Sequence, residues 1–150
     1  MSDLRELYQQ VILDHSRKPH NYHGMDNANR QAEGHNPLCG DHLKLYLLVE
    51  DGVVRDVSFE GAGCAIFKAS ASMMTDSVKG KRVAEVEALF EKFHEMLSRD
   101  IGKPFNSAPL GKLAVFSGVC EFPVRVKCAT LAWHTLHSAI EGKQDSVTTE

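Results

Sequence analysis

Residues 43–59 read LKLYLLVEDGVVRDVSF. Every second residue from Leu43 to Val49 is apolar, as in a strand that buries one of its two faces. The pair Asp51-Gly52 is typical of a tight hairpin turn, and the alternation resumes after it. This stretch therefore predicts a β-hairpin with one buried face.

Helical patterns lie on both sides of the hairpin. The spacing of apolar residues predicts helices at about residues 3–15, 64–79, 82–99 and 128–141. The glycines of Gly61-Ala62-Gly63 are expected to end the second strand of the hairpin. Four further stretches are less regular and are predicted as a short edge strand (29–34), a loop (101–109), one or two helical turns (110–117) and a frayed polar tail (143–150).

Length and charge limit the possible functions. The chain has 150 residues with a formal charge of −3, which fits one domain, 1–150, able to fold without metal. The negative charge gives no electrostatic reason to expect nucleic acid. The N-terminal residues lack the apolar core of a signal peptide, and no run of residues is apolar enough to span a membrane. We therefore expect a cytoplasmic protein.

Four cysteines occur in this chain, and three of them stand where a predicted loop meets a predicted element. Cys39 with Asp41, then Cys64, then Cys128 would supply three thiolates and one carboxylate, a set that suits a tetrahedral divalent ion. In a reducing compartment such cysteines are ligands or nucleophiles more often than disulfide partners. The alternative, that each is a small buried apolar residue, stays open at this stage. Cys120 has no glycine turn or helix start of its own and is predicted to be structural.

The predicted positions of two cysteines indicate how easily their thiols lose a proton. Cys64 and Cys128 are both predicted near helix N-termini, where unpaired N–H groups and the helix dipole favour the thiolate. The histidines are expected to be solvated or hydrogen-bonded rather than ligands, among them His15 and His20. His134 and His137 on the last helix could support the site from a distance.

Several motifs, in order, carry a resemblance to a known family. They are Leu7–His15, Asn36–Asp41, Gly61–Ile66, Ala69–Ser72 and Phe122–Trp133. The sequence is similar to the U-type iron–sulfur assembly proteins, the IscU/NifU N-terminal family, and within it to the SufU branch. IscU-type scaffolds carry a histidine directly before the third cysteine, where this chain has Lys127, and they have a shorter step than the 64 residues from Cys64 to Cys128.

This resemblance implies a fold and a function. The fold is α+β and SufE/IscU-like, a small antiparallel sheet with helices packed on one face. The implied metal ligands are Cys39, Asp41, Cys64 and Cys128, the implied cofactor is zinc, and the implied partner is a pyridoxal-phosphate cysteine desulfurase of the SufS type. Cys39 is expected to leave zinc and attack the desulfurase persulfide, so that the protein is a sulfurtransferase-type partner of that enzyme rather than a stand-alone enzyme. A downstream iron–sulfur scaffold or apo-proteins would receive the sulfur.

Two other functions use the same residues. One is a scaffold on which a [2Fe–2S] cluster forms and is passed to apo-proteins, with iron in place of zinc; the absence of the histidine at position 127 argues against it. The other is a zinc-stabilised interaction module without sulfur chemistry.

Overall fold

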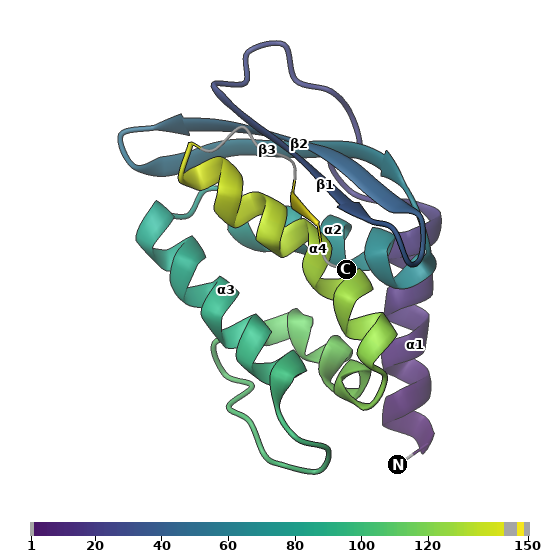
Figure 1. Cartoon of the computed structure of the whole chain (residues 1–150). Helices are drawn as coiled ribbons and strands as arrows, with labels where there is room; N and C mark the ends of the chain where they lie inside the picture. The colour runs from purple at the N-terminus through teal and green to yellow at the C-terminus, as the bar shows by residue number, and fades with distance from the viewer. Residues whose placement is uncertain (1, 143–146, 149–150) are drawn as a thin grey trace.

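The structure, a computed structural model, describes residues 2–142 and 147–148. Figure 1 shows a sheet covered by helices on one side. In chain order the elements are α1 (Ser2–Arg17), β1 (Arg30–Asn36), β2 (Asp41–Glu50), β3 (Val53–Ala62), α2 (Ala65–Val78), α3 (Val83–Ser98), the 3-10 helix η1 (Gly111–Glu121), α4 (Pro123–Ile140) and β4 (Val147–Thr148).

The predicted hairpin is confirmed as β2 and β3, which pair antiparallel. Asp51 and Gly52 both adopt positive φ, 53° and 73°, as a type I′ turn requires. As predicted, the second strand ends within Gly61-Ala62-Gly63, at Ala62, although Gly61 still pairs with Leu43. A side chain at Gly61 would collide with the carbonyl of His42, so the glycine permits the pairing of the two backbones there.

The strand expected at 29–34 extends further and lies inside the sheet, whose order is β3-β2-β1-β4. β1 pairs antiparallel with β2, and β4 pairs with it in parallel through Gly34 and His35. Val147 and Thr148 belong to the tail that was expected to fray, so that prediction is wrong for these two residues; residues 143–146 and 149–150 lie outside the described part.

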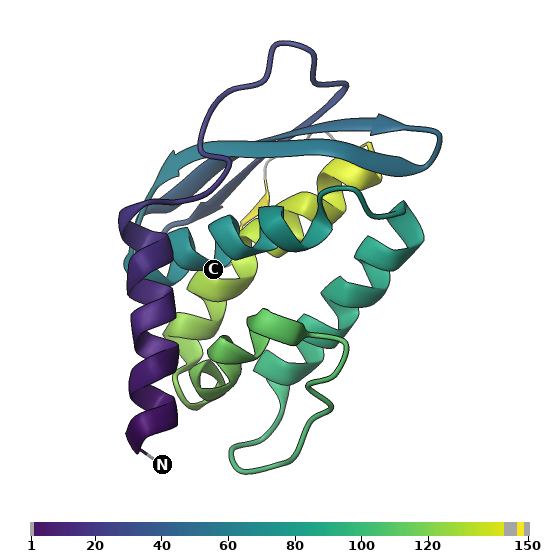
Figure 2. The same cartoon turned by 180° about the vertical axis from the view of Figure 1, so that it is seen from behind.

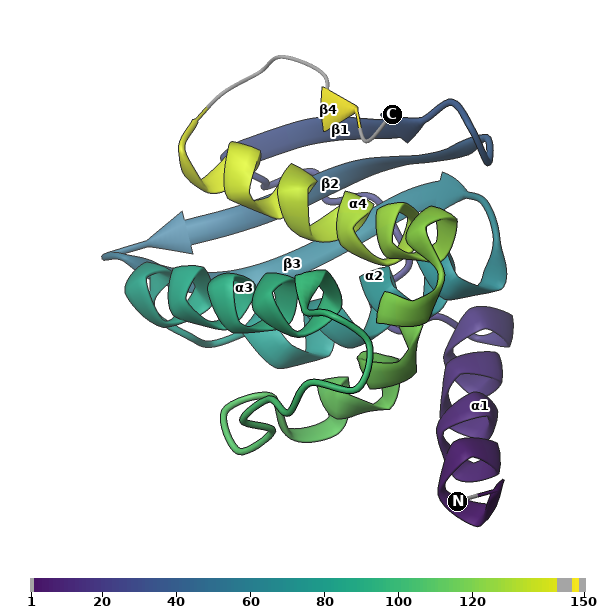
Figure 3. The same cartoon turned by 60° about the horizontal axis from the view of Figure 1, so that its bottom comes forward.

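Figure 3 shows the layer of helices beneath the sheet. The α+β prediction, with a small sheet and helices on one face, is confirmed. The core between the layers holds Leu45 and Leu47 from the sheet and Phe67, Phe93 and Trp133 from the helices, all fully buried.

Small side chains bring α2 and α4 into contact. Ser70 on α2 is buried, and its hydroxyl donates to the carbonyl of Ala129 on α4 at 2.5 Å. The indole N–H of Trp133 donates back to the Ser70 hydroxyl at 3.2 Å. The two helices are therefore joined by paired polar groups as well as by apolar packing.

The segment between α1 and β1 runs on the side of the sheet away from the helices, as Figure 2 shows. Near its start this segment contacts the edge of β3, where the N–H of Phe59 donates to the carbonyl of Asn21 at 3.0 Å. Among the described residues, no helix has the combined length and apolarity needed to cross a membrane.

The last helix begins earlier than predicted, at Pro123 instead of residue 128. Proline is favoured at the first helical position, where its missing N–H has no partner to lose. Phe122 is therefore the N-cap residue of α4, and Pro123 is its first helical residue. The helical turns predicted at 110–117 are part of the longer η1, Gly111–Glu121.

Candidate metal centre

Asp41, the first residue of β2, lies at the centre of the predicted site. Its side chain is completely buried. One carboxylate oxygen accepts the N–H of Cys64 at 2.8 Å, and the other lies 3.8 Å from the sulfur of Cys64. The carboxylate therefore joins the start of β2 to the start of α2.

Cys39 lies in the short turn between β1 and β2. Asn36 organises this turn: its carbonyl accepts the N–H of Gly40 at 2.9 Å and its side-chain oxygen accepts the N–H of Leu38 at 3.2 Å. Gly40 has a φ of 75°, a conformation that glycine adopts without strain. Cys39 itself is half-buried, whereas Leu38 beside it is largely exposed.

Cys64 is the N-cap residue of α2. Its sulfur accepts the N–H of Phe67 at 3.5 Å, which satisfies one of the unpaired donors of the first turn. Gly63 precedes it, and a side chain there would collide with the carboxylate of Asp41 and the ring of Phe67. The glycine thus keeps Asp41 and Cys64 close together.

Cys128 lies inside α4, in its second turn, with 2% of its surface exposed. The prediction that it stands at a helix N-terminus is wrong, because α4 begins at Pro123. Its sulfur lies 3.2 Å from the sulfur of Cys39, and the side-chain amide of Asn36 donates to it at 3.8 Å. Arg125, one turn earlier, is exposed and lies over the ring of Phe122.

These four side chains come together from four elements of the chain. One ligand atom each from Cys39, Asp41 and Cys128 lies within 4.8 Å of the other two. Cys64 adjoins this group through its contact with Asp41. Sequence positions as far apart as 39 and 128 therefore meet at the end of the sheet where β1, β2, α2 and α4 converge.

Burial raises the pKa of the Cys64 thiol above its ordinary value, despite the N–H of Phe67, which acts in the other direction. Burial also raises the pKa of Cys128, with further contributions from Cys39 and Asp41. The expectation that helix starts favour both thiolates is therefore wrong for the chain alone. A bound cation would supply the missing charge compensation, and three sulfurs with one buried carboxylate form a donor set that fits zinc.

The other candidates lie elsewhere. Cys120, on η1, is half-buried and does not belong to the clusters formed by the described residues. His134 and His137 contact α3 instead of the cysteines: the ring of Phe90 packs against both, and His137 pairs with Glu87 at 2.7 Å. They do not contact the described side chains of the metal centre.

The sequence pattern did not single out a second cluster. His15 and His20 are hydrogen-bonded, as expected for the histidines, but they also lie together with Asp76 of α2, with one ligand atom of each within 4.8 Å of the others. Asp76 is 56 residues from His20 in the sequence, and no spacing rule joins positions so far apart.

Comparison with known proteins gives consistent results. The profile of the NifU-like N terminal domain matches residues 7–129. The zinc-dependent sulfurtransferase SufU of Bacillus subtilis is 39% identical over 140 residues, covering 93% of this chain and 92% of that protein. The iron–sulfur cluster assembly scaffold protein IscU of Streptococcus pyogenes is 40% identical over 141 residues, covering 94% and 87%. The crystal structure of a protein from Fervidobacterium islandicum, described as an iron–sulfur cluster assembly scaffold protein for the SUF system (SufU), superposes with a TM-score of 0.81 at 36% identity, covering 87% of this chain and 94% of the other.

Proposed function

Because this chain belongs to the NifU-like N-terminal domain family, whose SufU and IscU members take part in iron–sulfur cluster assembly, we propose that it is a zinc-dependent sulfurtransferase. It would accept sulfur from a pyridoxal-phosphate cysteine desulfurase of the SufS type and pass it to a downstream scaffold or to apo-proteins. The observation that carries the proposal is the gathering of Cys39, Asp41 and Cys128 within coordination range, with Cys39 on the short turn between β1 and β2.

Cys39, Asp41, Cys64 and Cys128 would hold the zinc ion. Zinc keeps thiolates deprotonated and cannot itself be oxidised or reduced, so it protects the sulfurs without adding redox chemistry. Asp41 is the hard oxygen donor in a soft set and would bind most weakly. The Asn36 amide, which donates to the sulfur of Cys128, would help to orient that ligand.

Cys39 would be the acceptor. It is half-buried beside the exposed Leu38, whereas Cys128 is buried in α4 and the Cys64 sulfur caps α2. Its thiolate would attack the outer sulfur of the desulfurase persulfide, forming a new S–S bond while the bond to the desulfurase cysteine breaks. The desulfurase cysteine leaves as a thiolate, and Cys39 becomes the persulfide. Persulfide sulfur moves without net oxidation or reduction.

One feature favours sulfur transfer over the second candidate, a [2Fe–2S] scaffold. Lys127 stands where the family resemblance implies a histidine in IscU-type scaffolds. Identity and coverage do not separate the two functions, because a scaffold IscU of Thermotoga maritima matches this chain as fully as the zinc-dependent SufU does. The comparable identity to an IscU keeps the scaffold as the alternative to be tested. We also propose that the protein acts in the cytoplasm, where thiols stay reduced.

Metal analysis distinguishes the two functions. Protein purified without added iron is expected to contain one zinc ion at the cysteine centre and to have no visible colour. It is expected to raise the turnover of a SufS-type desulfurase when cysteine is supplied. A coloured protein that contains iron and inorganic sulfide, and that does not stimulate the desulfurase, would instead establish the scaffold.

Replacing Asp41 with alanine should lower zinc affinity while leaving the chain folded. The change removes an oxygen ligand and also leaves the N–H of Cys64 without its partner, at a cost of about 1–3 kcal/mol. Competition with a chromogenic chelator measures the affinity, and urea unfolding of the metal-free protein measures the fold. Unchanged zinc affinity would show that the carboxylate is not a ligand.

A further inference from the structure

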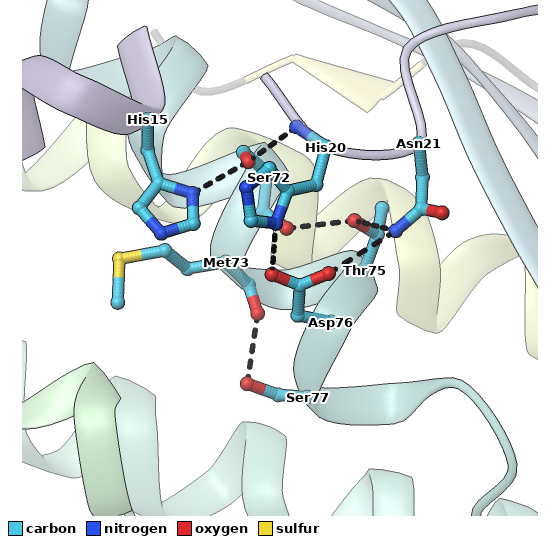
Figure 4. Close-up of polar contacts among 8 residues, drawn as sticks. All are labelled: His15, His20, Asn21, Ser72, Met73, Thr75, Asp76 and Ser77. Carbon is cyan, nitrogen blue, oxygen red and sulfur yellow. Dashed lines mark hydrogen bonds and ion pairs between the residues drawn. The ribbon is translucent and has the colours of Figure 1, made fainter. Parts of the chain in front are cut away.

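The second cluster joins the end of α1 to the last turns of α2, on the opposite end of α2 from Cys64. His15 belongs to α1, His20 to the segment after it, and Asp76 to α2. Figure 4 shows the two imidazole rings next to each other above the carboxylate of Asp76. The ring centres are 4.5 Å apart, and a ring nitrogen of His20 lies 2.5 Å from Asp76.

Hydrogen bonds from neighbouring residues fix these side chains in place. The hydroxyl of Ser72 lies 2.7 Å from a ring nitrogen of His15 and accepts the backbone N–H of His20 at 2.8 Å. The amide of Asn21 donates to Thr75 at 2.9 Å and to the free oxygen of Asp76 at 3.3 Å. Such outer hydrogen bonds are the ones that orient histidine and carboxylate ligands around a metal ion.

The backbone of Asn21 explains how the cluster is assembled. Its φ is 55°, in the left-handed region that asparagine tolerates better than most residues. The chain turns sharply there after leaving α1, so the side chains of His20 and Asn21 both reach α2. The segment is therefore arranged around α2 by a local conformation and not by apolar packing alone.

We propose that His15, His20 and Asp76 form a second metal site, which takes a divalent transition-metal ion such as zinc. Two imidazoles and one carboxylate are a ligand set for such ions. Donor atoms around a tetrahedral zinc lie about 3.4 Å apart, from Zn–N and Zn–O bonds of about 2.0–2.2 Å. Ligand atoms already within 4.8 Å of one another need only small shifts to reach this spacing. The hydrogen-bonded atoms of His20 and Asp76, 2.5 Å apart, would move slightly apart to admit the ion.

The exposure of the ligands permits this shift. The side chains of His20 and Asp76 are 54% and 44% exposed, so they can move without disturbing the core. A cavity of about 470 Å³ beside the cluster, lined in part by Met73 and Lys112, leaves room for water in the open coordination positions.

This second site is separate from the cysteine centre. Asp76 follows Cys64 by twelve residues on the same helix, or about 18 Å at 1.5 Å per residue. One ion cannot bridge the two sites. An ion at the second site would hold α1 against α2. The proposal of this site does not depend on whether the cysteine centre transfers sulfur.

Zinc counting tests the proposal. Protein with its cysteine centre loaded is dialysed against excess Zn²⁺, and the bound zinc is measured by mass spectrometry of the acid digest. Two zinc ions per chain are expected for the wild type and one each for His20→Ala and Asp76→Ala. His23→Ala is the matched control, because His23 lies in the same segment and bonds only to the carbonyl of Gly24 among the described contacts; it should bind two.

Thermal unfolding gives a second readout. Excess Zn²⁺ is expected to raise the melting temperature of the zinc-loaded wild type and of His23→Ala, since an ion that binds only the folded state stabilises it. The same addition should leave His20→Ala unchanged. The melting temperature of His20→Ala before zinc is added shows that this variant is folded.

Three results would overturn the second site: a wild type that binds only one zinc ion, a His20→Ala variant that still binds two, or an equal rise in melting temperature with and without His20.

Addition of Co²⁺ to the zinc-loaded wild type separates this proposal from that for the cysteine centre. Bound cobalt without a sulfur-to-metal charge-transfer band supports the second site, whereas bound cobalt with that band would place the ion on the cysteines and overturn it.

Discussion

Cys39→Ala is expected to reduce stimulation of a cysteine desulfurase to background, because it removes the acceptor sulfur. The chain should remain folded, since the turn is held by Asn36 and Gly40 and not by the cysteine side chain. The assay follows sulfide or alanine released from cysteine by the desulfurase with and without this protein. Circular dichroism of the variant reports its fold.

Two controls separate the loss of the acceptor from the loss of a ligand. Cys120→Ala removes a half-buried thiol outside the cluster and should keep full stimulation. In the wild type, peptide mass spectrometry after incubation with the desulfurase and cysteine should locate the added sulfur on Cys39. Added sulfur on Cys64 or Cys128, or full stimulation by Cys39→Ala, would move the acceptor role to another thiol.

Trp133→Ala is expected to destabilise the fold by about 3–5 kcal/mol, the range for truncating a buried large aromatic residue. Trp133 has no exposed surface, stacks on Phe93 with ring centres 4.6 Å apart, and donates to Ser70. A domain of this kind has a total stability of about 5–15 kcal/mol, so the variant could lose most of it. Urea unfolding measures the change in the free energy of unfolding. It is monitored by circular dichroism, because the variant has lost its tryptophan and cannot be monitored by tryptophan fluorescence.

Trp133→Phe is the matched control for this variant. It keeps an aromatic ring against Phe93 and loses the indole N–H, while the hydroxyl of Ser70 still donates to Ala129. The loss of one buried hydrogen bond costs about 1 kcal/mol, so the midpoint should move much less than for alanine. Equal midpoints for the wild type and Trp133→Ala would contradict the position of this ring in the core.

The parts of the fold with a strong apolar period could be predicted from the sequence. The hairpin around Asp51-Gly52, and the helices α2 and α3, lie where the pattern predicts them. β1 was predicted only in part, because its inward positions include Ala32 and Gly34, which give a weak apolar signal. A side chain at Gly34 would collide with Leu43 and Thr135, so the strand carries small residues where α4 packs closely.

The cysteine cluster was predicted through a family resemblance. The spacing of the cysteines alone did not decide whether they are metal ligands or small buried apolar residues. The structure brings Cys39, Asp41 and Cys128 together, while burial raises the thiol pKa values that helix starts were expected to lower. Burial follows from the packing of α4, which begins earlier than predicted.

The short turn between β1 and β2 limits how far the acceptor can travel. Asn36 and Asp41 pair across the two strands and fix its ends. A chain spans at most about 3.5 Å per residue, so Cys39, two residues from Asp41, stays within about 7 Å of that anchor. In the proposed transfer, the desulfurase would therefore have to bring its persulfide to within this distance of Asp41. Compatibility between a desulfurase and this proposed acceptor would then depend on how far the persulfide extends beyond the surface of the desulfurase.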